Sequence, residues 1–235
     1  MSMLHLLAAL MPKGTPFALT ISFITSVTAD AATITMPTVQ TGDFVLYAEF
    51  PAQATSGTTQ MTPVTPTGLS FTPMVQYPIE ADKAGVTRND LSIWTYGRIV
   101  QNGGTESGTI ITGYNADALA GRRRKTIAVF RGNRALSAFG TPKSVSKVWS
   151  AGDPAATSSP LSVGTAPFLA LGLYRGTAAI GTLSFNPAAD GTIDNGTTTR
   201  IGYKMCNAAD AGTLAIDQDD SGSATISVSY LLELS

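Results

Sequence analysis

The chain has 235 residues and a formal net charge of −1 at pH 7; 43% of its residues are hydrophobic and only 13% are charged. Because soluble domains carry about 25% charged residues, much of this surface is expected to be neutral and prone to association. The small net charge excludes long-range attraction of nucleic acid, an anionic membrane or an acidic substrate. No uncharged apolar stretch approaches the ~18–20 residues that span a bilayer, so no membrane partner is expected.

Residues 1–19 are expected to form a short apolar arm ahead of the main domain. Large apolar side chains recur there at helical spacing: Met3, Leu4, Leu7, Leu10 and Met11. A cleaved signal peptide is disfavoured because no Lys or Arg precedes this run and Pro12 interrupts it. The arm is expected to pack on its own subunit or to insert into a neighbour, which makes Met3, Leu4 and Leu7 interface candidates.

Residues 20–235 are dominated by period two, with apolar residues alternating with Ser, Thr or Gly in short runs bounded by turn residues. These runs predict strands at residues 33–36, 43–50, 91–100, 108–114, 126–130, 168–174, 181–185, 200–206, 213–217 and 225–234. In the last run Ser227 and Ser229 lie opposite the apolar residues, which predicts a sheet with one buried face. No helical stripe intervenes. The sequence therefore predicts an all-β fold, an antiparallel β-sandwich of jelly-roll type.

Long polar segments between these strands are expected to be loops and candidate contact surfaces: residues 53–67, 77–90 and 150–165. Four prolines are expected to make the region of the first loop stiff and extended, because proline fixes φ and lacks a donor for ladder pairing: Pro63, Pro66, Pro73 and Pro78. The third loop is a candidate division between two half-sandwiches of one domain.

Residues that could carry catalysis or a cofactor are sparse. His5 is the only histidine and Cys206 the only cysteine, so an intrachain disulfide is impossible and a zinc site is not expected. No Gly-x-Ser-x-Gly motif nominates a nucleophile. The chain is therefore expected to be non-enzymatic and to bind no cofactor.

One segment has the spacing of a calcium-binding loop. Asp217, Asp219 and Ser221 supply oxygen donors at the first, third and fifth positions, followed by Gly222, as at the start of an EF-hand loop. The twelfth position is Val228 rather than Glu. A hairpin turn explains the same residues and is favoured, because Asp, Ser and Gly are preferred in turns; a hard-cation site is the alternative.

The only dense basic cluster precedes the strand predicted at residues 126–130 and consists of Arg122, Arg123, Arg124 and Lys125. Three interpretations stay open: a solvated strand end, salt bridges to an adjacent subunit, or contact with nucleic acid phosphates. Nucleic acid is the least favoured, because no aromatic residues are interleaved with the basic ones.

Two further chemistries depend on positions in space that the sequence does not fix. A glycosidase would need two carboxylates at a set separation, and the first half of the chain offers Glu49, Glu80, Asp90 and Glu106. A carbohydrate-binding face would need exposed aromatic rings, and the candidates are Tyr77, Trp94 and Trp149. Aromatic residues on strands are more often core residues, so both remain alternatives.

Several motifs in residues 25–135 resemble β-rich structural proteins of tailed bacteriophages. They are Met36-Pro37 followed by Gly42-Asp43, then Trp94-Thr-Tyr96-Gly-Arg98, Ser107-Gly108-Thr109, and Phe130-Arg131-Gly132. Leu69 stands where such proteins often have Trp in a Pro-x-Gly-Trp motif. Independently of the family, Gly42-Asp43 predicts a turn in which Gly adopts positive φ and Asp accepts hydrogen bonds from local amides.

The resemblance implies a virion location and partners among copies of this chain and other virion proteins. The expected function is that of a virion structural protein, either a capsid decoration or a component of the head, collar, tail or fibre. The first alternative is a receptor- or carbohydrate-binding module that contacts a host surface glycan. The second alternative, less favoured, is a tail-associated polysaccharide hydrolase.

Overall fold

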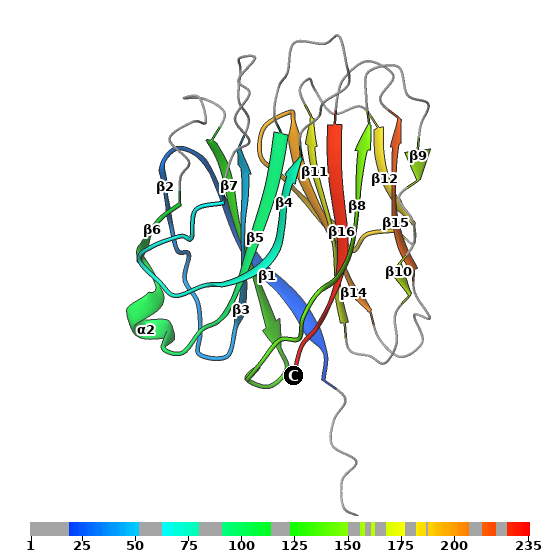
Figure 1. The fold of residues 1–235 in the computed structure, drawn as a ribbon. Coiled ribbons are helices and arrows are strands. Elements are labelled where there is room, and N and C mark those ends of the chain that lie inside the picture. Colours follow the sequence, from blue (N-terminus) through cyan, green and yellow to red (C-terminus); the bar gives the residue numbers. More distant parts are fainter. Residues whose placement is uncertain are drawn as a thin grey trace, which may run out of the picture.

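The computed structural model describes residues 19–51, 63–79, 91–113, 123–149, 156–157, 161–162, 168–176, 182–186, 188–206, 213–219 and 225–235. In this part of the chain the sheets are antiparallel, and the one short helix is α2 (Gly103–Glu106). The predicted all-β antiparallel sandwich is confirmed (Figure 1). Its jelly-roll connectivity stays a prediction.

The first five-stranded sheet contains only strands that lie before residue 133 of the chain. Its order is β1 (Ile21–Asp30), β7 (Arg123–Gly132), β3 (Phe44–Pro51), β5 (Leu91–Ile99) and β4 (Thr72–Ile79). β1 and β4 are therefore the edge strands of this sheet.

The second five-stranded sheet contains strands from the second half of the chain only. Its order is β13 (Gly191–Asp194), β14 (Thr199–Cys206), β11 (Phe168–Gly176), β16 (Thr225–Glu233) and β8 (Lys143–Trp149). The chain passes from the first sheet to the second between Gly132 and Lys143. The predicted division at residues 150–165 lies largely outside the described residues.

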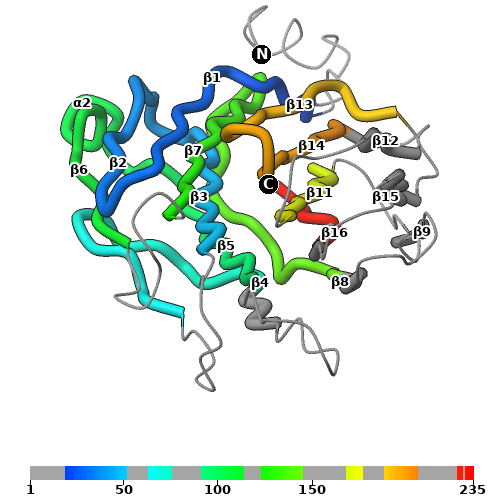
Figure 2. Tube along the Cα trace, turned by 90° about the horizontal axis from the view of Figure 1, so that it is seen from above, coloured from blue at the N-terminus to red at the C-terminus, as the bar shows by residue number. Residues whose placement is uncertain are grey.

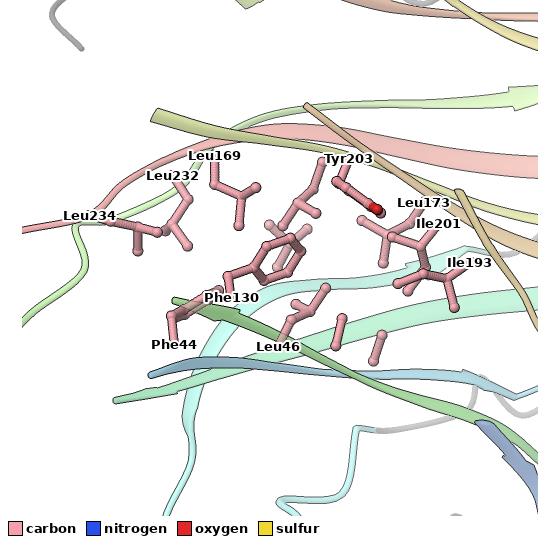
Figure 3. Close-up of a cluster of buried hydrophobic side chains, with 14 of the residues drawn as sticks. Phe44, Leu46, Phe130, Leu169, Leu173, Ile193, Ile201, Tyr203, Leu232 and Leu234 are labelled. Carbon is pink, nitrogen blue, oxygen red and sulfur yellow. The ribbon is translucent and has the colours of Figure 1, made fainter. Parts of the chain in front are cut away.

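The main hydrophobic core fills the space between these two sheets. Alternate residues of β3, among them Phe44 and Leu46, project into it together with Phe130 of β7. Leu169 and Leu173 of β11 face them from the second sheet (Figure 3). Burying these side chains gives the apolar free energy that joins the two halves of the chain.

A second hydrophobic cluster covers the other face of the first sheet. Val45 and Tyr47 of β3 pack there against a small two-stranded sheet of β2 (Thr33–Thr35) and β6 (Ile110–Thr112). Seen from above, β2, β6 and α2 form a separate layer on the outer side of the first sheet (Figure 2). The first sheet is thus buried on both faces, which a two-layer sandwich would not give.

The expectation that β16 has one solvent-exposed face is wrong. Ser227 and Ser229 are both fully buried, although Glu233 is exposed as expected. A third sheet explains the burial, because its central strand lies against β11 and β16 (Figure 1). Its strands are β9 (Ala156–Thr157), β10 (Leu161–Ser162), β12 (Thr182–Asn186) and β15 (Thr213–Asp219).

Each predicted strand overlaps an observed strand, but the prediction of a loop from residue 77 onward is wrong at residues 77–79, which belong to β4. β4 tolerates two prolines because it is an edge strand and its pairing with β5 is irregular between Pro73 and Gln76. At this irregularity the Thr95 hydroxyl donates to the Val75 carbonyl at 3.0 Å and accepts from the Val75 amide at 2.9 Å.

Candidate functional site

The motifs singled out in residues 25–135 contact one another in the folded chain. Asp43 accepts two hydrogen bonds from Arg131, from Nε at 2.6 Å and from Nη2 at 2.8 Å. It also accepts from the backbone amide of Gln40 at 2.7 Å, and Gly42 has a φ of 84°. The predicted Gly42-Asp43 turn is therefore confirmed, and its carboxylate also holds β7 through an ion pair.

A second ion pair closes the connection between β5 and β6. Glu106, at the end of α2, accepts from Arg98 Nε at 2.7 Å and from Nη2 at 2.8 Å. The same carboxylate accepts from the backbone amides of Gln101 at 2.8 Å and Asn102 at 3.1 Å. Burial alone would raise the pKa of Glu106, but these hydrogen bonds outweigh burial and lower the pKa below its ordinary value of 4.5.

The remaining motif residues join the same layer through their backbones. The Met36 amide donates to the Thr109 carbonyl at 2.9 Å, and the Gly108 amide donates to the Met36 carbonyl at 3.0 Å. The Val39 amide donates to the Ser107 hydroxyl at 3.0 Å. Hydrogen bonds thus hold together segments that lie about 70 residues apart in the sequence, as Val39 and Ser107 do.

The most unusual chemistry is a buried charged network on the outer face of the first sheet. Glu49 lies between Trp94 and Lys125 in the strand register, and its Oε1 is 3.6 Å from the Lys125 Nζ. The Tyr47 hydroxyl donates a hydrogen bond to the same oxygen. Glu49 and Lys125 are each only 2% exposed. A Cβ at Gly113 would collide with both Glu49 and Tyr47, so this backbone closes the network on one side.

The environment of this network favours uncharged forms. Burial raises the pKa of Glu49, although the neighbouring Lys125 charge opposes the shift. Burial likewise lowers the pKa of Lys125, against the attraction of Glu49. The pKa of Tyr47 rises through burial and through the Glu49 charge. The pair joins β3 to β7 and is enclosed on the sides that the structure describes.

The structure places part of the basic cluster inside the subunit. Lys125 is the partner of Glu49, and the Arg124 guanidinium donates to the Asn195 carbonyl in the turn between β13 and β14. The side-chain amide nitrogen of Asn195 (Nδ2) donates in turn to the backbone carbonyls of Lys125 at 2.8 Å and Ala29 at 3.3 Å. This group therefore ties the edges of the two large sheets together. Arg122 lies outside the described residues, and contact of Arg122 or Arg123 with an adjacent subunit stays a prediction.

Several other predicted site residues lie outside the part of the chain that the structure describes. Met3, Leu4, Leu7 and Ser221, with Glu80 and Asp90, lie outside the described residues. Asp217 and Asp219 lie in β15, where their backbones pair with Ser184 and Thr182 of β12. Within the described ranges, no group of three or more His, Cys, Asp or Glu is placed to hold a metal ion, and no helix is long and apolar enough to cross a membrane.

The aromatic candidates are not assembled into a described binding face. Trp94 is fully buried within the second hydrophobic cluster, so it cannot stack on a sugar. Tyr77 lies in β4 and Trp149 in β8, both edge strands. A surface hollow of about 450 Å³ is lined by residues of one loop, Thr65–Phe71, and none of its lining residues is charged.

Sequence reasoning missed the Glu49–Lys125 pair. Its signal was a glutamate inside the apolar run at residues 44–51 and a lysine just before the run at residues 126–130, since a charge on a buried strand requires a partner.

Comparison of the chain with protein-family models, curated proteins and solved structures finds no match.

Proposed function

We propose that this chain is a non-enzymatic structural subunit of a tailed-phage virion, which acts through its surfaces and their contacts with other subunits. The proposal covers a capsid decoration or a component of the head, collar, tail or fibre. Its partners are copies of the chain and other virion proteins.

The observation that carries this proposal is the use of the motif residues. The charged residues of these motifs and their connections form two ion pairs. They are Asp43 with Arg131 and Glu106 with Arg98. These pairs hold loops and strands in place and do not line the described hollow. The motif residues on which the expected resemblance rests serve the framework, and this favours a role based on shape and rigidity.

The surface supplies the second support. Only 13% of the residues are charged, and several acidic side chains are paired within the chain: Asp30, Asp43, Glu49, Glu106, Asp190 and Asp194. Large apolar side chains are meanwhile exposed, with Ile110 60% exposed and Ile24 39% exposed. A neutral surface with exposed apolar residues is suited to coverage by neighbouring subunits.

Imaging tests the location. Purified virions incubated with an antibody against this chain, then examined by negative stain, should carry label at one repeated position on the particle. An antibody raised against an unrelated host protein provides the control. Particles that stay unlabelled, although denatured particles react with the antibody on a blot, would point to a position inside the virion. Particles that react in neither test would refute the proposal.

A further inference from the structure

The open edges of the two large sheets are not alike. Edge strands present unpaired backbone groups, and proteins normally protect them with proline, lysine, bulges or short length. β4 contains Pro73 and Pro78, and its pairing is interrupted by an irregularity. β8 contains Lys143 and Lys147, and β13 is only four residues long. Three of the four edges are thus protected by proline, lysine or short length.

The fourth edge, β1, lacks most of these protections. It has ten residues, contains neither proline nor lysine, and carries a single charge at its last residue, Asp30. Among the described residues, its backbone bonds only to β7, apart from the Ala29 carbonyl that accepts from Asn195. Its one irregularity lies between Phe23 and Thr25 and leaves Ile24 39% exposed. The edge therefore presents an apolar side chain beside an uncharged ladder.

We propose that β1 is the pairing edge of the assembly and that its partner is β1 of a second copy of this chain. Two copies related by a twofold axis would align their β1 strands antiparallel and continue one sheet into the next. This arrangement places the two Asp30 carboxylates at opposite ends of the shared ladder, so like charges do not meet. A second copy also matches β1 in length and in lack of charge. The inference deepens the proposed function and rests on its assembly role.

Sedimentation of the full chain over a range of concentrations tests the pairing. The unmodified chain should associate reversibly. Thr28→Lys, which adds a lysine at an exposed position of β1, should abolish this association, because a charged lysine on an edge strand opposes pairing with a second strand. The matched control is Thr192→Lys, an exposed position on β13, which should associate as the unmodified chain does. Far-ultraviolet circular dichroism should show that both variants retain the β fold.

Hydrogen exchange gives an independent reading. Amides of residues 21–28 should exchange more slowly as concentration rises, and this protection should vanish in Thr28→Lys and in Ile24→Lys. A chain that stays monomeric at every concentration would overturn the inference, as would association that Thr28→Lys leaves unchanged. Association lost with Leu4→Asp or Leu7→Asp and kept with Thr28→Lys would also overturn it, because the N-terminal arm would then be the contact. Each of these outcomes leaves the virion location to be judged separately by imaging.

Discussion

Asp43 and Arg131 lie 88 residues apart in the sequence and form a two-bonded ion pair in which the carboxylate is 1% exposed and the guanidinium 30% exposed. The pair fixes the turn before β3 to the end of β7, two strands that are neighbours in the first sheet. The ion pair is therefore part of the framework of this sheet.

Removing the Asp43 carboxylate should reduce the stability of the folded chain. Asp43→Ala leaves Arg131 and the Gln40 amide without their acceptor and should lower the free energy of unfolding by about 2–3 kcal/mol. Asp194→Ala is the matched control, since Asp194 also pairs with an arginine but is 48% exposed, and it should cost less than about 1 kcal/mol. Urea unfolding measures both. Equal losses in the two variants would contradict the role given to Asp43.

The buried network should show strong coupling between its two charges. Lys125→Met leaves Glu49 buried beside Tyr47 without its cation and should destabilise the chain by about 3–5 kcal/mol. Adding Glu49→Gln removes the uncompensated charge and keeps an oxygen acceptor for the Tyr47 hydroxyl, so the double variant should recover most of this loss. A double-mutant cycle measures the recovery. Additive losses would mean that the two side chains act independently.

Acid should destabilise the chain partly through Glu106. Its pKa is lower in the folded chain than the ordinary 4.5, so below pH 4.5 the unfolded chain takes up this proton before the folded chain does. The stabilisation by the ionised carboxylate is complete above pH 4.5 and is lost as the pH falls through the folded pKa. Glu106→Gln should therefore be less stable at pH 7 and should lose less stability than the unmodified chain on acidification. Equal slopes below pH 4.5 would contradict this.

Alanine substitutions at two glycines with positive φ should distinguish the cost of backbone strain from the cost of crowding by neighbouring atoms. Gly42 has φ of 84°, and an added Cβ would lie 2.5 Å from the Ala135 Cβ, whereas Gly108 has φ of 78° and open space around it. Gly108→Ala should cost about 1–2 kcal/mol through left-handed strain alone. Gly42→Ala should cost about 1–3 kcal/mol more through overpacking. Thermal unfolding compares them, and equal losses would show that crowding at Gly42 has no effect.

Ten strands were predicted from runs in which apolar and small polar residues alternate, whereas β1, β4, β8, β9, β10 and β13 were not predicted. Sequence reasoning missed β1 because the irregularity after Phe23 breaks the alternation, and it missed β4 because prolines normally exclude a strand, although an edge strand admits them. Burial of Ser227 and Ser229 was not predictable, because small polar residues suit both solvent and a tightly covered face. The third sheet that covers them comes from other parts of the chain.

The candidate site was predictable only in its local parts. The Gly42-Asp43 turn follows from the properties of two adjacent residues, but the pairing of Asp43 with Arg131 depends on which strands become neighbours. Lys125 looked like part of a surface cluster for the same reason: its partner, Glu49, lies 76 residues earlier in the sequence. Strand order decides such pairs, and the alternation of side chains within single strands does not encode it.

Mass spectrometry of gradient-purified virions asks whether the chain is a stoichiometric part of the particle. If it is a virion subunit, peptides from both large sheets, for example from residues 123–132 and 168–176, should be present at a fixed ratio to the main capsid protein across the particle peak. A chain found only in the lysate, or at a ratio that varies from fraction to fraction, would show that it is not a virion subunit.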